Sequence, residues 1–288
     1  MFTPFAFVKT APVPFTGILD TYSSAAGAWS VRRLSSTYTG SILTVRRESD
    51  DTTEDIGYTT NGDLDTGAIS SFCTGTEGYV TTLYDQSGNG INLTQSTHIR
   101  QPLIYSASVI TKGPNAEPSL YFDGIQTHLS GAYATSSDSY MSVFCVLAPF
   151  DTGSTYVAYA QSTTTTAAPA FGVISHEDGW FGDFMWGAGQ EAQYSPNTTD
   201  LAVGAAIRKS SVSQNVVYLN SESGSTKTAA TDVTIGPVIT MGCIFSGTNS
   251  GDGTFPFKGY ISEVIVWRSD QTSNVSGIDS DMGTYYGV

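Results

Sequence analysis

Short runs of alternating apolar and polar residues, separated by clusters of Gly, Ser, Thr, Asn and Asp, recur along most of the chain. Such alternation is typical of half-buried β-strands, because successive side chains of a strand point to opposite faces of the sheet. The clearest examples lie at residues 79–84, 141–148, 201–208 and 261–268. Many short strands with turn signals between them predict an all-β fold, a jelly-roll sandwich of two antiparallel sheets.

One segment favours a helix instead. Asp65 can cap the first turn of residues 65–73, and Ala68, Ile69 and Phe72 then share one face. The remaining apolar runs predict further strands at residues 28–34, 42–47, 54–58, 101–105, 118–124, 156–160, 170–175, 215–219, 233–235, 238–245 and 255–260.

The first twenty residues differ from the rest of the chain. Pro4, Pro12 and Pro14 interrupt an apolar sequence, and proline resists both helices and central strands. We therefore expect an extended N-terminal arm over residues 1–20, followed by a single β-sandwich domain over residues 21–288. Exposed apolar side chains of this kind are unfavourable in water, so they must pack against another protein surface. We expect a neighbouring subunit to provide that surface, and the chain's own sandwich is the alternative.

The charge balance excludes one class of partner. The chain has 12 Lys and Arg against 26 Asp and Glu, which gives a formal net charge of −14. A surface that binds phosphates needs the opposite sign, so no nucleic-acid partner is expected. No stretch approaches the roughly 18 apolar residues of a membrane span, and the N-terminus lacks the unbroken apolar core of a signal peptide. The sequence thus predicts no membrane insertion.

Cysteine usage indicates a reducing compartment. Cys73, Cys145 and Cys243 are odd in number and widely spaced, which disfavours both a disulfide framework and a zinc site. Cys145 and Cys243 lie in apolar runs typical of strand interiors. We therefore expect three free thiols that pack as small apolar side chains.

Metal and cofactor chemistry finds no support in the sequence. The acidic pairs at residues 50–51 and 54–55 can offer oxygen ligands to calcium, but a solvated acidic turn is the favoured interpretation. No phosphate-binding loop and no nucleophile elbow occur. We expect no cofactor and no metal. The histidines are scattered without the spacing of metal ligands, at His98, His128 and His176.

A sharp turn follows the strand at residues 79–84. Gly88 and Gly90 permit positive φ angles, and Asn89 tolerates the left-handed region, so the chain can reverse here. An alternating run, residues 91–94, comes next. The turn therefore predicts a loop-closed pair of strands.

Several motifs around this turn occur in an order that resembles a known family. They closely resemble the catalytic domain of family B α-L-arabinofuranosidases over about residues 22–95, and less closely to about residue 287. The same N-terminal motif is similar to structural proteins of tailed bacteriophages. The motifs are residues 36–40, 45–53, 84–90 and 93–95.

Two later segments resemble a broader fold group. Residues 120–124 and 257–267 are similar to internal and closing strands of laminin-G-like and concanavalin A-like lectin and glucanase domains. The resemblance implies a concanavalin A-like jelly roll.

The arabinofuranosidase resemblance implies positions for two catalytic carboxyl groups. By position, Glu177 matches the nucleophile, and Ser246 stands where the acid/base Asp is expected. Serine cannot act as a carboxylic acid, and Asp252 lies on the wrong side of that loop in this register. The adjacent Cys-Cys pair of the enzymes' substrate pocket is also absent. These departures predict no catalytic residue in this chain, with Glu177 as a vestige.

The densest aromatic cluster follows Glu177, at Trp180, Phe181, Phe184 and Trp186. Aromatic faces stack on sugar rings, so a carbohydrate site is one interpretation, and core or loop packing is the other. The residues expected to bind carbohydrate are Glu177, Asp178, Trp180, Trp186, Ser246 and Asn249.

Three functional classes follow from these observations. The favoured one is a non-enzymatic surface protein of a phage virion, either a capsid decoration or a tail or fibre component, assembled in the host cytoplasm. Its expected partners are other virion proteins and a host-surface glycan, and it is expected to act as a homo-oligomer or in multivalent display. The second class is a carbohydrate-binding adhesion module. The third is a glycoside hydrolase that acts on arabinofuranosides through Glu177.

Overall fold

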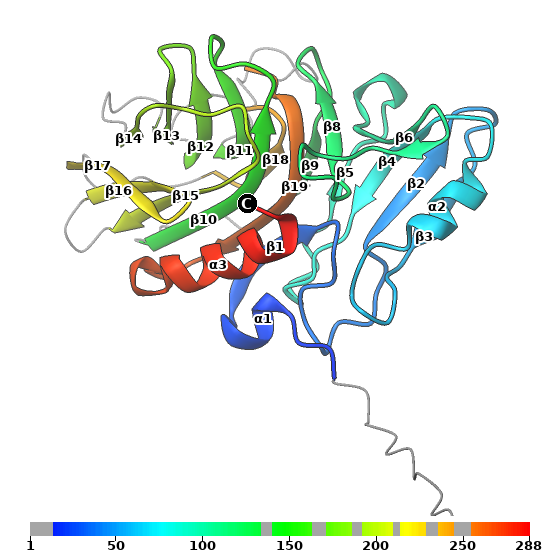
Figure 1. The fold of residues 1–288 in the computed structure, drawn as a ribbon, viewed down its shortest axis with the longest axis horizontal. Helices are drawn as coiled ribbons and strands as arrows, with labels where there is room; N and C mark the ends of the chain where they lie inside the picture. The colour runs from blue at the N-terminus through cyan, green and yellow to red at the C-terminus, as the bar shows by residue number, and fades with distance from the viewer. Residues whose placement is uncertain are drawn as a thin grey trace, which may run out of the picture.

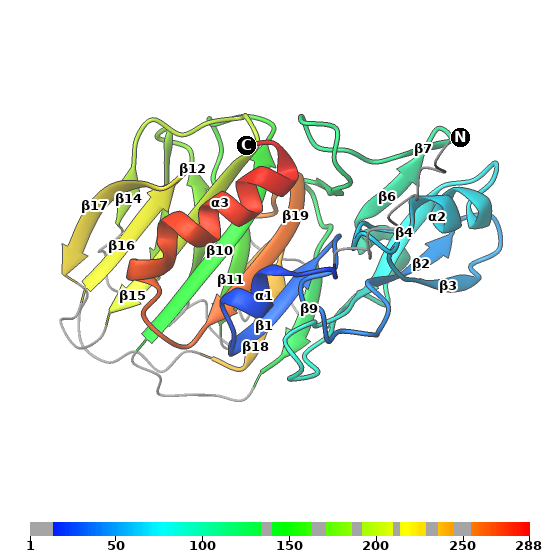
Figure 2. The same cartoon turned by 60° about the horizontal axis from the view of Figure 1, so that its bottom comes forward.

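Two antiparallel sheets stack face to face and form most of the molecule (Figures 1 and 2). The structure, a computed structural model, describes residues 14–133, 140–162, 171–185, 192–209, 214–228, 236–244 and 255–288. Every strand pairing among these residues is antiparallel, which confirms the predicted all-β class.

The first sheet carries the two longest strands at its centre. Their neighbours follow in the order β17–β16–β15–β10–β19–β1. The bounds are β17 Glu222–Thr228, β16 Gln214–Leu219, β15 Ala202–Lys209, β10 Tyr140–Pro149, β19 Lys258–Trp267 and β1 Ala25–Ser30.

The second sheet lies behind the first in Figure 1 and runs in the order β14–β13–β12–β11–β18–β9–β5. Its bounds are β14 Gln193–Tyr194, β13 Trp180–Met185, β12 Phe171–His176, β11 Tyr156–Ser162, β18 Val238–Met241, β9 Leu129–Ala132 and β5 Leu93–Thr94.

A smaller group of strands joins the two sheets at one side. From β19 the pairing continues through β8, β6 and β4, and β4 then pairs with β5 of the second sheet. β2 and β3 extend this group outward from β4, and β7 pairs with β6. The bounds are β2 Leu43–Arg47, β3 Thr53–Ile56, β4 Gly78–Leu83, β6 Leu103–Ser106, β7 Val109–Ile110 and β8 Leu120–Asp123.

The core lies between the sheets and is filled by large apolar side chains. All but one residue of β10 and all six residues of β1 are buried. The largest fully buried side chains include Trp29, Trp267, Tyr159 and Phe122. The rings of Phe144 and Trp267 meet edge to face, with 5.7 Å between their centroids, an arrangement that aromatic pairs prefer.

The helices are few. α2 (Thr66–Phe72) confirms the predicted helix, and the Asp65 side chain accepts a hydrogen bond from the backbone amide of Ala68 as a cap. Two short 3₁₀ turns, η1 (His98–Arg100) and η3 (Thr272–Asn274), complete the connections. α3 (Val275–Tyr286) was not predicted. It packs across the first sheet through Ile278, Met282 and Tyr286 (Figure 2).

Part of the predicted N-terminal arm lies within the described residues. α1 (Ile18–Thr21) buries Ile18 and Leu19, and the Arg33 guanidinium lies 4.8 Å from the centroid of the Phe15 ring. Residues 1–13 lie outside the described part of the chain. The boundary between an arm and a domain at residue 20 stays a prediction.

The predicted turn after β4 has a structural role. Gly88 and Gly90 adopt positive φ angles of 90° and 74°, as expected. Asp85 is 6% exposed. Its carboxylate accepts hydrogen bonds from the backbone amides of Ala28, Ser87 and Ile91, at 3.0, 2.9 and 3.0 Å. The carboxylate thus ties the turn to β1.

The next residue, Gln86, ties the same turn to the segment after β1. Its Oε1 accepts from the amide of Leu34, and its Nε2 donates to the carbonyl of Arg32, both at 2.8 Å. Buried backbone groups need such partners, so the motif stabilises the chain entry into the first sheet.

The strands at the C-terminal end differ in one respect from the prediction. Residues 255–260 and 261–268 were expected as two strands, but β19 is continuous from Lys258 to Trp267. Gly259 has a φ of 145°, and a Cβ there would lie 2.2 Å from the carbonyl oxygen of Ala148. A glycine at this position therefore allows β19 to pass close to β10 without interruption.

The three cysteines are free and buried in the structure, as predicted. Burial raises the pKa of the Cys73 thiol to about 11, which leaves it protonated at neutral pH. No helix among the described residues has the length and apolar character to cross a membrane.

Candidate active site

Glu177 lies at the turn that joins β12 to β13, and its side chain is exposed. The turn closes with a hydrogen bond from the amide of Gly179 to the carbonyl of His176. Gly179 has a φ of 77°, which suits glycine in a tight turn. The sequence folds this way because the apolar residues of β12 end before His176 and three polar or small residues, Glu177 to Gly179, follow it.

The turn carrying Glu177 contacts the turn between β10 and β11. The backbone amide of Glu177 donates to Thr155 Oγ1 at 3.4 Å, and Ser175 pairs with Tyr156 in the ladder. On the neighbouring turn the Tyr156 hydroxyl donates to Asp151 Oδ2 at 2.8 Å. Burial, followed by smaller effects that include this carboxylate, raises the pKa of Tyr156. Asp151 is thus a second carboxylate in the same region.

The predicted neighbour Asp178 also lies on the turn. Its carboxylate is 77% exposed and lies 3.5 Å from Nδ1 of His176, and its amide donates to the same nitrogen at 3.2 Å. The structure therefore brings Glu177 and Asp178 together at one exposed turn, where water and a substrate can reach both.

The residues on either side of 245–254 lie along the other edge of β11, the edge that does not pair with β12. The amide of Val157 donates to the carbonyl of Phe255 at 3.1 Å. Ile244 packs with Val157 and Ile174 in a small apolar cluster, and Phe255 packs against it. Since β12 and this segment flank β11 on its two edges, the flanks of residues 245–254 lie about two strand spacings, or roughly 10 Å, from β12.

Several predicted site residues lie outside the described part of the chain. They are Trp186, Ser246 and Asn249, and the side chain of Trp180 is likewise not described. Their proposed roles in sugar binding and the proposed role of position 246 stay predictions. Among the described site residues, Glu177 and Asp178 are the pair that the structure places together.

One other carboxylate on β13 has no access to substrate. Asp183 is fully buried, and it accepts hydrogen bonds from the side chain of Asn215 and from the backbone amide of Ala192. These partners hold a buried charge in place, so Asp183 is a structural group.

The described residues contain no group of three or more His, Cys, Asp or Glu side chains arranged to hold a metal ion. The acidic pair at residues 50–51 instead binds arginines. Asp50 pairs with Arg47 at 2.6 Å, and Asp51 pairs with Arg46 at 2.7 Å.

Comparison with known proteins identifies what the N-terminal third is similar to. Residues 20–116 match the family model "Alpha-L-arabinofuranosidase B, catalytic". The chain is 40% identical to α-L-arabinofuranosidase B of Aspergillus oryzae over 95 residues, which are 31% of this chain and 19% of that protein. It is also 40% identical to an α-L-arabinofuranosidase of Hypocrea jecorina over 85 residues, 28% of this chain and 17% of that protein. The matches span under a fifth of these relatives.

Solved structures extend the likeness to most of the fold. A Glu-to-Gln mutant of a GH54 α-L-arabinofuranosidase soaked with 4-nitrophenyl α-L-arabinofuranoside has a TM-score of 0.69 and 20% sequence identity, and the match covers 92% of this chain and 64% of that one. An arabinofuranosidase complexed with arabinofuranosyl-α-1,2-xylobiose gives the same values. At this identity the likeness shows a shared fold.

These matches correct the favoured functional prediction. The prediction of a non-enzymatic phage virion protein is wrong, because the family model and the relatives are α-L-arabinofuranosidases. The predicted virion partners, the host-surface glycan, the multivalent display and the virion location are wrong for the same reason. The matches support the arabinofuranosidase part of the sequence resemblance, and they give no support to the phage or concanavalin A-like parts.

The non-enzymatic prediction rested on Ser246, on the missing Cys-Cys pair and on the missing signal-peptide pattern, which counted against a secreted enzyme. Residues 20–116 carry a positive match that these absences do not cancel.

Proposed function

We propose that the chain is a glycoside hydrolase that cleaves α-L-arabinofuranosides, with Glu177 as its nucleophile. The observation that carries the proposal is the position of Glu177, an exposed carboxylate on a turn of a fold shared with arabinofuranosidases over 92% of the chain. The match of residues 20–116 to the arabinofuranosidase family model supports the same reaction.

The proposed chemistry is a double displacement. Glu177 attacks the anomeric carbon as the bond to the leaving oxygen breaks, and a second carboxyl group gives that oxygen a proton. Water, deprotonated by the same carboxylate, then displaces Glu177 from the sugar. Retaining enzymes hold the two carboxyl groups about 5–5.5 Å apart. The second group must therefore come from a segment close to the β12–β13 turn.

Three aspartates are candidates for the general acid. Asp178 shares the turn with Glu177, and Asp151 lies on the turn that contacts it through Thr155. Asp252 belongs to the segment whose flanks lie on the far edge of β11. Because serine cannot act as a carboxylic acid, we expect one of these three aspartates to supply the proton in place of position 246.

The nucleophile is tested with 4-nitrophenyl α-L-arabinofuranoside. The wild type should release 4-nitrophenol, and Glu177→Gln should lower kcat by at least about 10³-fold, since a nucleophile cannot be bypassed. Glu54→Gln, at an exposed glutamate of β3, is the matched control and should keep wild-type activity. Equal activity of wild type and Glu177→Gln would show that another residue is the nucleophile. If the wild type cleaves no arabinofuranoside, the proposal fails.

The general acid is assigned with two substrates. A 4-nitrophenyl leaving group needs little protonation, whereas an arabinofuranosyl oligosaccharide needs the acid. The Asn variant of the true acid should lose about 10²–10⁴-fold on the oligosaccharide and far less on the aryl substrate. We compare Asp151→Asn, Asp178→Asn and Asp252→Asn in this way. If none shows the difference, the proton comes from elsewhere.

A further inference from the structure

A row of paired side chains crosses the strands that join the two sheets. The registers pair Arg46 with Tyr79, Tyr79 with Leu103, Leu103 with Tyr121, and Tyr121 with Tyr260. Directly paired residues of an antiparallel sheet project from the same face. The row thus gathers three tyrosines from β4, β8 and β19 on one face, although they are far apart in the sequence.

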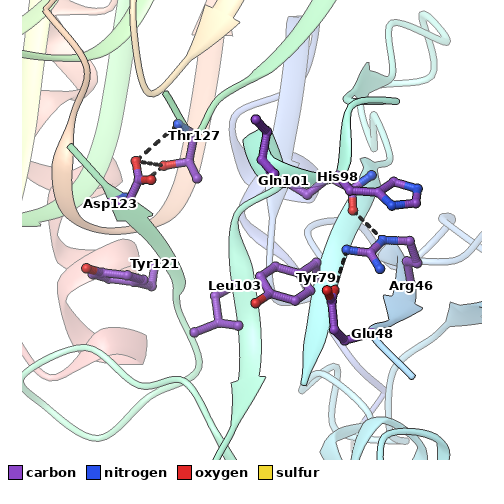
Figure 3. Close-up of a pocket in the computed structure, with 10 residues that line it drawn as sticks. Arg46, Glu48, Tyr79, His98, Gln101, Leu103, Tyr121, Asp123 and Thr127 are labelled. Carbon is purple, nitrogen blue, oxygen red and sulfur yellow. Dashed lines mark hydrogen bonds and ion pairs between the residues drawn. The ribbon is translucent and has the colours of Figure 1, made fainter. Parts of the chain in front are cut away.

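A cavity lies over the low point of this row (Figure 3). Leu103 is shorter than the tyrosines, so it forms a floor between Tyr79 and Tyr121. The cavity has a volume of about 350 Å³ and is open to solvent. Tyr79 and Tyr121 stand two strands apart, roughly 9.5 Å. Carbon atoms in contact need about 3.5–4.0 Å, so one six-membered ring fits between the two side chains.

Exposed apolar groups surround this cavity. The rings of Tyr121, Phe150 and Tyr260 form a cluster with centroid separations of 5.7, 5.9 and 5.3 Å. Phe150 is 44% exposed, and Ile99, which lines the cavity, is 65% exposed. Single exposed apolar residues need no explanation, but a grouped set beside a cavity indicates a binding surface.

The arginine that lines the cavity is already paired with protein oxygens. Arg46 is 3% exposed, and its guanidinium donates to Gln101 at 2.8 Å, Asp51 at 2.7 Å and Glu48 at 2.8 Å. Arg46 also lies over the Tyr79 ring, 5.1 Å from its centroid. With its donors directed at protein oxygens, Arg46 offers no free charge to a phosphate or carboxylate. The site therefore suits an uncharged ligand.

The Tyr79 ring and the Asp123 carboxylate are held in place by protein partners before any ligand arrives. The Tyr79 hydroxyl donates to Glu77 Oε2 at 2.5 Å, which holds the ring in one orientation. On the other side Asp123, next to Thr127 in Figure 3, accepts from the Thr127 hydroxyl at 2.8 Å and from the amide of Ile125 at 2.8 Å. A preformed site loses little side-chain freedom on binding.

We propose that this surface, whose residues do not include Glu177, binds a neutral glycan chain. One pyranose unit occupies the cavity between Tyr79 and Tyr121, and the next unit lies on the rings of Tyr121, Phe150 and Tyr260. The C–H groups on a sugar face carry partial positive charge and meet the negative faces of aromatic rings. Because the side chains of the row follow one another on neighbouring strands, about 4.8 Å apart, they fit an extended β-1,4-linked chain such as xylan better than a helical chain such as amylose.

The test is native gel electrophoresis in gels that contain soluble xylan, with amylose gels as the comparison. The wild type should be retarded by xylan and not by amylose. Tyr121→Ala should weaken the binding at least tenfold, and Tyr121→Phe, which keeps the ring, should restore most of it. Leu103→Trp should abolish binding, because the larger side chain fills the cavity. Tyr218→Ala, at a half-buried tyrosine of β16, is the matched control and should bind as the wild type does.

Binding and hydrolysis are separated in the same gels. Glu177→Gln should be retarded like the wild type, since the proposed surface does not include that turn. Absence of retardation by xylan overturns the glycan surface, whatever the hydrolytic activity. Retardation that Tyr121→Ala and Leu103→Trp leave unchanged overturns it as well, and so does loss of retardation in Glu177→Gln. Denaturation curves of each variant identify any loss that comes from unfolding.

Discussion

Asp85 and Glu177 are two carboxylates with opposite surroundings. Asp85 is buried, and three backbone amides and the Ser87 hydroxyl donate to it. Glu177 is exposed on a turn, and the contact that fixes its position runs through its backbone to Thr155. The first is arranged to hold the chain in place, and the second is free to meet a substrate.

Asp85 belongs to the part of the chain that most resembles arabinofuranosidases, whereas Glu177 is the residue proposed to take part in the reaction. Asp85 and Gln86 lie within residues 20–116, where the similarity to arabinofuranosidases is strongest. Both residues satisfy backbone groups of β1 and the segment after it. Glu177 lies outside that range. Asp85 and Gln86 in the N-terminal third therefore stabilise the fold. Activity must be tested at the turns of the second sheet, where Glu177 lies.

Asp85→Ala is expected to give the largest effect on stability. It leaves the buried amide of Ala28 and the partly buried amide of Ile91 without an acceptor, which should lower the free energy of unfolding by about 3–5 kcal/mol. Glu177→Gln should change it by less than about 0.5 kcal/mol. Urea denaturation measures both. Asp200→Ala, at an exposed aspartate, is the control. Equal losses for the Asp85 and Glu177 variants would remove the distinction between the two carboxylates.

Gln86→Ala should have an intermediate effect. It removes an acceptor from the amide of Leu34 and a donor from the carbonyl of Arg32, at a cost of about 1–3 kcal/mol. Gln86→Glu keeps the acceptor and loses the donor, so its loss of stability should be at least as large because a charge is buried. Denaturation midpoints in urea compare the two. A Gln86→Ala variant as stable as the wild type would show that the turn needs only Asp85.

The smallest expected effect is the loss of stability at low pH that follows protonation of Asp123. Burial alone would raise the pKa of Asp123, but hydrogen bonds from the amide of Ile125 and from Thr127 outweigh it and lower the pKa below its usual value. A depressed pKa contributes stability that is present above the unfolded pKa of about 3.9 and is lost as the pH falls through the folded value. Because the group is partly exposed, we expect less than about 1 kcal/mol.

The measurement is the unfolding free energy between pH 5 and pH 2.5. The wild type should lose stability as the pH falls over this range. Asp123→Asn should lose less, because it lacks a carboxylate whose protonation favours the unfolded state. Asp20, whose pKa is also lowered once hydrogen bonds from Gly17 and Ser36 offset its desolvation, remains to supply part of the loss. Identical pH profiles for the wild type and Asp123→Asn would assign the acid sensitivity to other groups.

Many strands could be predicted from the alternation of apolar and polar residues in the sequence. The run at residues 79–84 became β4, and residues 201–208 became most of β15. The cap at Asp65 located α2 correctly. α3 was missed because Gly277 and Gly283 lower its intrinsic helix propensity. The spacing of Val275, Ile278, Met282 and Tyr286 was the available signal, since these side chains are buried along one face.

The candidate site was only partly predictable. Glu177 was proposed from its position in the family resemblance, and its role as nucleophile stays a prediction. Its contact with Thr155 depends on the pairing of β11 with β12, which no local pattern specifies. The same holds for the row from Tyr79 to Tyr121, because two strand registers, β4 with β6 and β6 with β8, must be known before these residues can be placed on one face.

We expect the pairing of β1 with β19 to delay folding during synthesis. Ser30 Oγ donates to Glu263 Oε2 across 233 positions of the chain, and Arg32 forms an ion pair with the same buried carboxylate at 2.7 Å. A ribosome makes β1 first and releases its partner only after nearly all of the other strands. Through that interval the six apolar and small residues of β1, all buried at the end, have no neighbour in the first sheet. Contacts this distant in sequence close slowly, so the nascent chain carries an unpaired, aggregation-prone strand until β19 emerges.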